Sequence, residues 1–283
     1  MKLSIVLSTQ PAQFQAATFK GDLATNLSQI ALLGYDGIEL AIRDPKLIDL
    51  DLLDRLVRKY GLGVPAIGTG QAWGEDGLSF TDPDPKVRQA AIKRIKSHIP
   101  VAAHFEAVII IGLLRGIVKP GVEHSQAMDW LVMALRECSE AARPHGVRLA
   151  LEPINRYETT LINNATEGLD LIERVGADNF GLLLDTFHMN IEEADIEASI
   201  HACGERIFHF HVADSNRWYP GAGHLDFGSI LAELFTMDYR GWVSGEFIPK
   251  PDAATAAREC ITKLKTLGIG YNLNNIRNSS NAH

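Results

Sequence analysis

The clearest indication of the fold is the stretch Phe180-Gly181-Leu182-Leu183-Leu184-Asp185, which is apolar at every position until it ends at a carboxylate. A run that is apolar on both faces is typical of a strand in a parallel sheet, where helices cover the two faces. Helical patterns precede and follow it, at residues 166–175 and 196–203. The stretch therefore predicts a buried parallel strand with a charged residue at its carboxyl end.

The same alternation is repeated along the chain. Seven other short apolar runs occur, and an amphipathic stretch follows each of them; the runs cover residues 3–7, 37–42, 63–67, 107–111, 147–151, 207–212 and 242–247. The further helical patterns cover residues 22–33, 49–60, 86–105, 125–142, 228–235 and 253–267. A doubly wound dinucleotide fold would need GxGxxG after the first strand, where Ser8-Thr9-Gln10 stands. Eight alternating pairs predict an α/β fold, a single-domain (β/α)8 TIM barrel.

Length and composition limit the partners that this barrel can have. The chain has 283 residues, of which we assign 1–270 to the barrel domain and 271–283, rich in Asn and Ser, to a disordered polar tail. The net charge of −8 argues against binding to a nucleic acid. No signal peptide and no membrane span is indicated. We expect a cytoplasmic enzyme that acts on a small molecule.

Polar residues stand at the ends of the last four apolar runs, where barrel enzymes place their active sites. The fifth run ends in Glu152, the sixth in Asp185 and the eighth in Glu246, and the seventh contains His209 and His211. Glu152, Asp185, His211 and Glu246 are separated by 33, 26 and 35 residues. Each separation is about one βα unit of roughly 30 residues. The four side chains should therefore meet on neighbouring strands.

Three carboxylates and one imidazole form an oxygen-rich set of ligands, which suits Mn²⁺, Mg²⁺ or Co²⁺. His209 and His211 point to the same face of their strand. We take His211 as the ligand because it lies nearer the carboxyl end, and His209 as a deeper, structural residue. We predict that Glu152, Asp185, His211 and Glu246 hold one divalent cation, with Mn²⁺ as first choice and Mg²⁺ or Co²⁺ as alternatives. Taken singly, each acid could instead form a salt bridge at the end of its strand, and His211 could be a hydrogen-bonded histidine of the core.

The motifs around these residues are specific. They are Glu152-Pro153-Ile154-Asn155-Arg156-Tyr157-Glu158, the segment 185–193 and His209-Phe210-His211-Val212, followed by Asp214-Ser215-Asn216-Arg217. This set resembles the ketose 3-epimerases, of the D-tagatose 3-epimerase type, in the xylose-isomerase-like barrel superfamily. Segments 212–218, 41–45 and 67–72 are similar to a subgroup that acts on keto-hexuronates, the 5-keto-L-gluconate epimerases. The resemblance covers the whole chain except the tail.

The resemblance implies roles for particular residues. It implies the same four metal ligands, and substrate contacts at Glu158, His188 and Arg217. Homologous barrels also associate into dimers or tetramers, so we expect a homo-oligomer.

Inversion of a carbon next to a ketone requires that a proton leave one face and return to the other. A divalent cation can polarise the carbonyl and stabilise the enediolate. Glu152 and Glu246 come from strands separated by two others, so they can flank a bound sugar. We predict that these two glutamates are the catalytic acid and base.

Arginine positions bear on the charge of the substrate. Arg43, Arg115, Arg156 and Arg217 follow the second, fourth, fifth and seventh predicted strands. Arginine suits bidentate binding of carboxylates. We therefore favour an acidic keto sugar, of the 5-keto-L-gluconate or D-tagaturonate type. Arg43, Arg115 and Trp73 are further predicted substrate contacts, although loop salt bridges and aromatic core packing would explain such residues too.

Four alternatives stay open at this point. The same site could serve a neutral ketose 3-epimerase of the D-tagatose or D-psicose type, or an aldose–ketose isomerase of the hydroxypyruvate type. A DNA-repair endonuclease of the same superfamily would need a histidine cluster in the first half of the barrel, and the second to fourth runs end without one. A catalytically silent sugar-binding barrel is the alternative outside enzymes.

Overall fold

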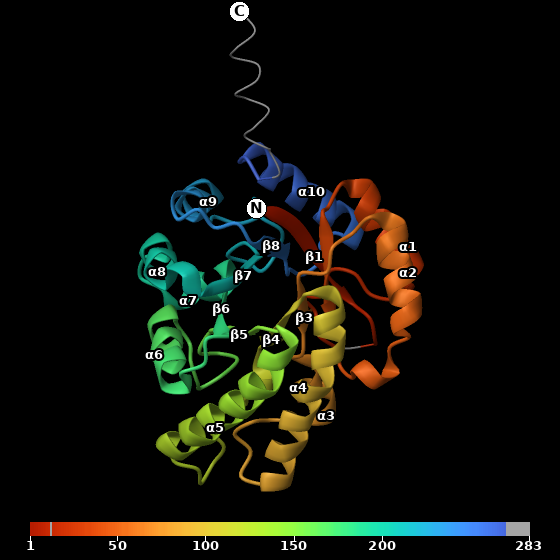
Figure 1. The fold of residues 1–283 in the computed structure, drawn as a ribbon. Coiled ribbons are helices and arrows are strands. Elements are labelled where there is room, and N and C mark those ends of the chain that lie inside the picture. The colour runs from red at the N-terminus through yellow and green to blue at the C-terminus, as the bar shows by residue number, and fades with distance from the viewer. Residues whose placement is uncertain (12, 270–283) are drawn as a thin grey trace, which may run out of the picture.

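The computed structural model describes residues 1–11 and 13–269, and it confirms the predicted barrel. Eight parallel strands close in chain order, because β1 pairs with both β2 and β8. They are β1 Lys2–Ser8, β2 Gly37–Ala41, β3 Ala66–Gly68, β4 Val108–Ile111, β5 Leu149–Leu151, β6 Phe180–Asp185, β7 Ile207–Val212 and β8 Trp242–Gly245. Figure 1 shows the strands at the centre and the helices around them.

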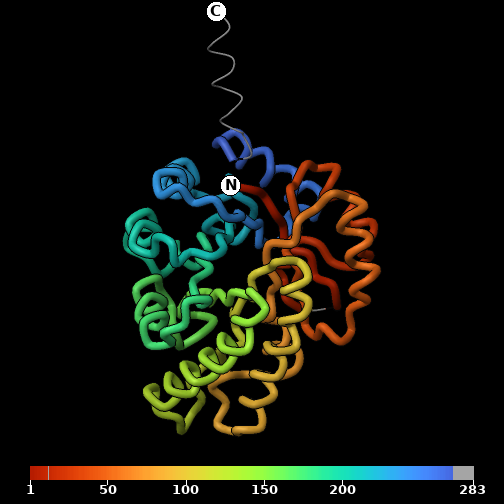
Figure 2. Tube along the Cα trace, viewed as in Figure 1, coloured from red at the N-terminus to blue at the C-terminus, as the bar shows by residue number. Residues whose placement is uncertain are grey.

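The helices form the outer layer of this single domain, which the tube in Figure 2 follows from red to blue around the barrel. Eight of them match the predicted helices, and two are additional short helices: α3 begins three residues after the end of β3, and α7 begins at the residue after β6. The helices are α1 Leu23–Leu33, α2 Leu50–Tyr60, α3 Gln71–Asp76, α4 Pro85–Phe105, α5 His124–Ala142, α6 Ala165–Val175, α7 Thr186–Glu192, α8 Ile196–Cys203, α9 Phe227–Thr236 and α10 Ala253–Thr266.

Local sequence fixes where the helices begin and end. The Asp22 side chain accepts a hydrogen bond from the Thr25 amide at the start of α1, and Asp49 does the same for Leu52 at the start of α2. Helix α1 ends at Gly34, which takes the left-handed conformation with φ 85° that a residue without Cβ adopts freely. Each strand is buried along nearly its whole length, as apolar runs between two layers require.

The start of β3 differs most from the start of its apolar run. The run covers residues 63–67, but β3 starts at Ala66. Pro65 has no amide hydrogen to give to a neighbouring strand, so the regular ladder starts after it. Gly63 makes only an isolated bridge, to Gly37.

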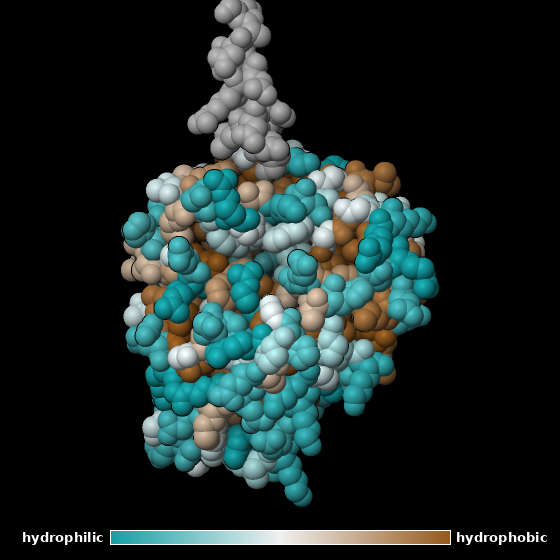
Figure 3. Space-filling view, in the orientation of Figure 1, coloured by the Kyte–Doolittle hydropathy of each residue, from teal (hydrophilic) through white to brown (hydrophobic). Residues whose placement is uncertain are grey.

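The remaining observations concern the predicted tail, membrane spans and the surface. The tail predicted at 271–283 lies outside the described residues. Among the residues that the structure describes, no helix is long and apolar enough to cross a membrane. Hydrophilic side chains cover most of the face seen in Figure 3, as expected for a barrel whose helices meet water.

Candidate active site

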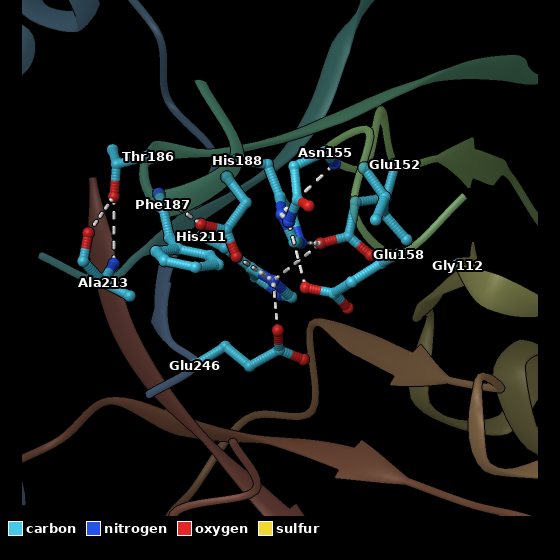
Figure 4. A network of polar contacts seen from close by, with 12 residues as sticks. Gly112, Glu152, Asn155, Glu158, Thr186, Phe187, His188, His211, Ala213 and Glu246 are labelled. Atoms are coloured by element: carbon cyan, nitrogen blue, oxygen red, sulfur yellow. Dashed lines mark hydrogen bonds and ion pairs between the residues drawn. The ribbon is translucent and has the colours of Figure 1, made fainter. Parts of the chain in front are cut away.

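Four polar side chains meet at the carboxyl ends of β5 to β8, as their spacing predicts. Glu152 directly follows β5, Asp185 ends β6, His211 lies in β7 and Glu246 directly follows β8. One ligand atom from each lies within 4.8 Å of the others, and all four residues are buried. Figure 4 shows Glu152 and Glu246 reaching His211 from different directions. We call these four residues the outer cluster.

The atoms at the centre of the outer cluster lack hydrogen-bond partners. His211 Nδ1 lies 3.6 Å from Asp185 Oδ2, 3.7 Å from Glu246 Oε2 and 3.8 Å from Glu152 Oε1. Glu152 Oε1, Asp185 Oδ2 and His211 Nδ1 are buried without any partner. Buried polar atoms normally have one. Ligands held by one ion at about 2.1 Å lie roughly 3–4 Å apart, so the outer cluster fits a divalent cation.

The electrostatics of the outer cluster agree with this fit. Burial, and then the charge of Glu246, raises the pKa of Glu152 well above its ordinary value. Burial also raises the pKa of Glu246, to about 7. For Asp185, burial raises the pKa, but the imidazoles of His211 and His188 outweigh it and leave the pKa lowered. Three buried carboxylates this close therefore need protons or a cation between them.

A fourth carboxylate, which the sequence analysis missed, lies one layer deeper. Glu39 in β2 is buried, and its Oε2 lies 2.8 Å from Nε2 of both His209 and His211. Burial raises its pKa, but these two imidazoles outweigh that effect and lower it far below its ordinary value. We call Glu39, His209 and His211 the inner cluster. In a neutral His211 ring that donates Nε2–H to Glu39, Nδ1 carries the lone pair that faces the outer cluster.

The three substrate contacts implied by the resemblance lie beside the outer cluster. His188 is on α7, not in an open loop, and its Nε2 is 3.6 Å from Glu152 Oε1. Arg217 Nη1 donates to Glu158 Oε1 at 2.8 Å, and Nη2 is 3.8 Å from Glu246 Oε2. The Nε–H of Arg217 is buried without a partner, so one donor remains for a ligand.

Two of the predicted arginine contacts, Arg115 and Arg43, do not line the cavity over the outer cluster. Arg115 is fully buried and donates to the carbonyls of Glu152, Gly112, Leu161 and Ile162, so its guanidinium connects the loops that follow β4 and β5. Arg43 points its Nε toward Asp76 at 3.9 Å and does not line the cavity. An arginine after a strand can turn outward or inward, and sequence position does not show which.

A cavity of about 290 Å³ opens over the outer cluster. His211, Glu152 and Glu246 belong to its polar lining. Trp73, a predicted contact, also lines it, on α3. Of the described residues that line the cavity, Arg217 is the one arginine; the apolar lining includes Phe14, Leu113, Ile110 and Ile154.

The chain is similar in sequence to a known family and to several named proteins. A family model described as "Xylose isomerase-like TIM barrel" matches residues 27–265. The chain is 33% identical over 219 residues to an L-ribulose 3-epimerase of Methylomonas sp. (strain DH-1), covering 76% of this chain and 75% of the relative. It is 30% identical over 233 residues to a D-psicose 3-epimerase of Ruminiclostridium cellulolyticum, covering 80% and 78%.

Solved structures show the same likeness. A crystal structure of a D-allulose 3-epimerase from Methylomonas sp. in complex with D-allulose has a TM-score of 0.80 and 27% sequence identity, over 94% of this chain and 96% of that one. In sequence, the chain is also 26% identical over 262 residues to a 3-dehydro-D-guloside 4-epimerase of Escherichia coli, covering 88% of this chain and 97% of the relative.

Proposed function

Because this chain belongs to the xylose isomerase-like TIM barrel family, we propose that it epimerises a keto sugar with the help of one divalent cation. Its named relatives are sugar epimerases, which makes it an isomerase-class enzyme. The cation would be held by the outer cluster, Glu152, Asp185, His211 and Glu246. The observation that carries the proposal is the set of three buried, unpartnered atoms that face one another there.

The ligand set also bears on the metal. When bound, the cation supplies Lewis acidity that acidifies the C–H bond next to the ketone. We propose Mn²⁺, with Mg²⁺ and Co²⁺ as alternatives, because carboxylate oxygens predominate over imidazole nitrogen.

The positions of two glutamates in the outer cluster support a proposal for proton transfer. Glu152 and Glu246 follow β5 and β8, which β6 and β7 separate. Both line the cavity, so they can contact a bound sugar from different sides. We propose that one removes the proton and that the other, protonated, returns a proton to the opposite face of the enediolate form of the substrate. His188 and Arg217 would donate to substrate oxygens that gain negative charge.

Two substrate classes each have an observation in their favour. An acidic keto sugar is supported by the motif resemblance at 212–218 and by the unpartnered Nε–H of Arg217. A neutral ketose is supported by the cavity lining, where Arg217 is outnumbered by Glu39, Glu75, Glu152, Glu158 and Glu246 among the described residues. We keep the acidic keto sugar as first choice.

A substrate panel tests both the activity and the substrate. The protein, loaded with Mn²⁺, is incubated in D₂O with 5-keto-L-gluconate, D-tagaturonate, D-tagatose, D-psicose and D-fructose. We expect inversion next to the ketone, with deuterium at the inverted carbon, and fastest turnover of the keto acids. A clear preference for the neutral ketoses contradicts the acidic substrate, and an aldose product favours the hydroxypyruvate-type isomerase. No turnover of any sugar by the metal-loaded protein contradicts the function.

Two expectations about the whole enzyme stay predictions. Light scattering on purified protein checks for the homo-oligomer, and fractionation of cells checks for a cytoplasmic location.

A further inference from the structure

The buried side-chain amide of Asn155 contacts two of the predicted substrate residues, His188 and Glu158. Asn155 is 1% exposed and follows β5 by four residues. Its Oδ1 accepts from the Tyr157 amide at 3.0 Å. Its Nδ2 lies 3.0 Å from Glu158 Oε1 and 2.8 Å from His188 Nδ1. Figure 4 shows Asn155, His188 and Glu158 side by side at the edge of the site.

The two ends of this amide cannot be exchanged. A backbone N–H can only donate, so the Tyr157 amide requires the Asn155 oxygen. A carboxylate can only accept, so Glu158 requires the Asn155 nitrogen. A flipped amide would set N–H against N–H on one side and oxygen against oxygen on the other. The hydrogen-bond network therefore assigns Nδ2 to the side that faces His188.

This orientation determines which nitrogen of His188 carries the hydrogen. The second hydrogen of Asn155 Nδ2 points to His188 Nδ1 at 2.8 Å, and the Asn155 backbone N–H points to the same atom at 3.5 Å. Two donors meet Nδ1, so Nδ1 must accept with its lone pair. In a neutral imidazole the hydrogen then lies on Nε2. That atom is 3.6 Å from Glu152 Oε1, and His188 lines the cavity.

We propose that Asn155 is a positioning residue that holds His188 as the Nε2–H tautomer, so that a substrate oxygen always meets a donor. The catalytic consequence rests on the proposed function, because it requires a substrate oxygen that gains charge in the transition state. A donor held in place before the reaction needs no reorganisation when that charge develops.

The same amide supports the neighbouring contacts. Glu158 Oε1 accepts from Asn155 Nδ2 and also from Arg217 Nη1, at 3.0 and 2.8 Å. Asn155 therefore joins His188 to Glu158, and Glu158 in turn binds Arg217, so one chain of hydrogen bonds links the three residues expected to contact substrate.

The test replaces this amide by a carboxylate of the same shape. In Asn155→Asp the group that donated to His188 Nδ1 can only accept, so in the neutral ring the hydrogen moves to Nδ1 and Nε2 is no longer a donor. Removal of one donor of this kind lowers kcat by about 100-fold or more. We expect this loss in kcat for the Mg²⁺-loaded enzyme, with metal affinity within about threefold of wild type because the outer cluster is untouched.

Asn163→Asp is the matched control. Asn163 lies in the same loop, and its Nδ2 donates only to backbone carbonyls, those of Ile154 at 2.7 Å and Thr159 at 3.0 Å. The same chemical change there disturbs the loop but leaves His188 Nδ1 facing Asn155. We expect a lower melting temperature for Asn163→Asp and an unchanged His188 tautomer.

Nitrogen NMR of histidine-labelled, Mg²⁺-loaded protein reads the tautomer directly, with the His188 signal assigned by its loss in His188→Gln. Wild type should show neutral Nε2–H at neutral pH, and Asn155→Asp should not. A wild-type Nδ1–H or doubly protonated ring overturns the inference even if the variant fails to fold. So does an Asn155→Asp protein that keeps Nε2–H and near-normal kcat. Nε2–H in a wild-type protein that epimerises no sugar supports the tautomer and contradicts the proposed function instead.

Discussion

The inner and outer clusters contain the same kinds of group, share His211, and differ in how their polar atoms are satisfied. In the inner cluster, Glu39 accepts from His209 and His211 at 2.8 Å. In the outer cluster, the closest approaches to His211 Nδ1 are 3.6 to 3.8 Å, and three central atoms have no partner. Burial is nearly equal in the two.

This difference separates a structural group from a ligand site. A closed set of hydrogen bonds stabilises the fold and leaves nothing for a ligand. An open set of buried carboxylates destabilises the fold unless a cation joins it. The clusters should therefore respond in opposite ways when their members are changed.

Removal of the metal should have the largest effect. A Lewis acid contributes several kcal/mol to the transition state, so chelator-stripped protein should lose about 1000-fold or more in epimerase activity. The inner cluster needs no cation, so the circular dichroism spectrum should stay unchanged. Activity is measured after dialysis against EDTA and after addition of Mn²⁺, Mg²⁺ or Co²⁺. Protein shown to be metal-free by elemental analysis yet fully active would contradict the role of the outer cluster.

Glu246→Gln should separate activity from stability. Loss of an acid–base group lowers kcat by about 10²- to 10⁴-fold. The metal-free variant should be at least as stable as wild type, because burial raises the pKa of Glu246 to about 7 and a neutral amide removes that unfavourable charge. Kinetics and urea unfolding of the metal-free protein measure the two effects.

Glu152→Gln is the companion variant, with the same expectation for kcat. Near-normal epimerase rates in both variants, with metal still bound, would exclude the two-glutamate mechanism.

Glu39→Ala should show the opposite response in stability. It leaves two buried imidazole N–H groups without an acceptor, at about 1–3 kcal/mol each. Metal affinity should fall about 10- to 100-fold, because the carboxylate that orients His211 is lost. Glu39→Gln keeps an acceptor oxygen and should have a smaller effect on both quantities. Competition with a chelating dye measures metal affinity, and urea unfolding measures stability. An unchanged metal affinity in Glu39→Ala would contradict a role of Glu39 in orienting His211.

His209→Phe should have the smallest effect. Glu39 keeps His211 as a partner, so stability should fall by about 1 kcal/mol, the typical net contribution of one hydrogen bond. Metal affinity and kcat should stay within about threefold of wild type, because His209 does not reach the outer cluster. A loss as large as that of Glu39→Ala would show that the inner cluster acts as one unit.

The sequence predicted the fold and the outer cluster because both depend on regular spacing. Glu152, Asp185 and Glu246 each end an apolar run, and the closed barrel brings such positions to one end. The strict alternation was also enough to predict eight strands in order, and the family resemblance is confirmed by the relatives. An apolar run does not give the first residue of its strand, because a residue such as Pro65 before β3 can delay the regular pairing.

The rest depends on side-chain direction and long-range partners. Glu39 stands inside the apolar run Gly37–Ile42, and its partners are 170 and 172 residues away. A single charge within a buried strand was the available signal, because such a charge must have a partner. Arg115 was assigned to the substrate, but its length lets it turn to four carbonyls instead. Short helices such as α7 offer too few residues for a helical period to be seen.

The pairing of β8 with β1 has a consequence for synthesis of the enzyme. Glu246 follows the last strand of the barrel, so a growing chain on the ribosome lacks this proposed ligand until all eight strands have been synthesised. Before then, β1 and β7 each have an edge without its final neighbour. The proposed metal site would therefore be completed only after β8, and a cation bound by all four residues could not act as a template for the early barrel.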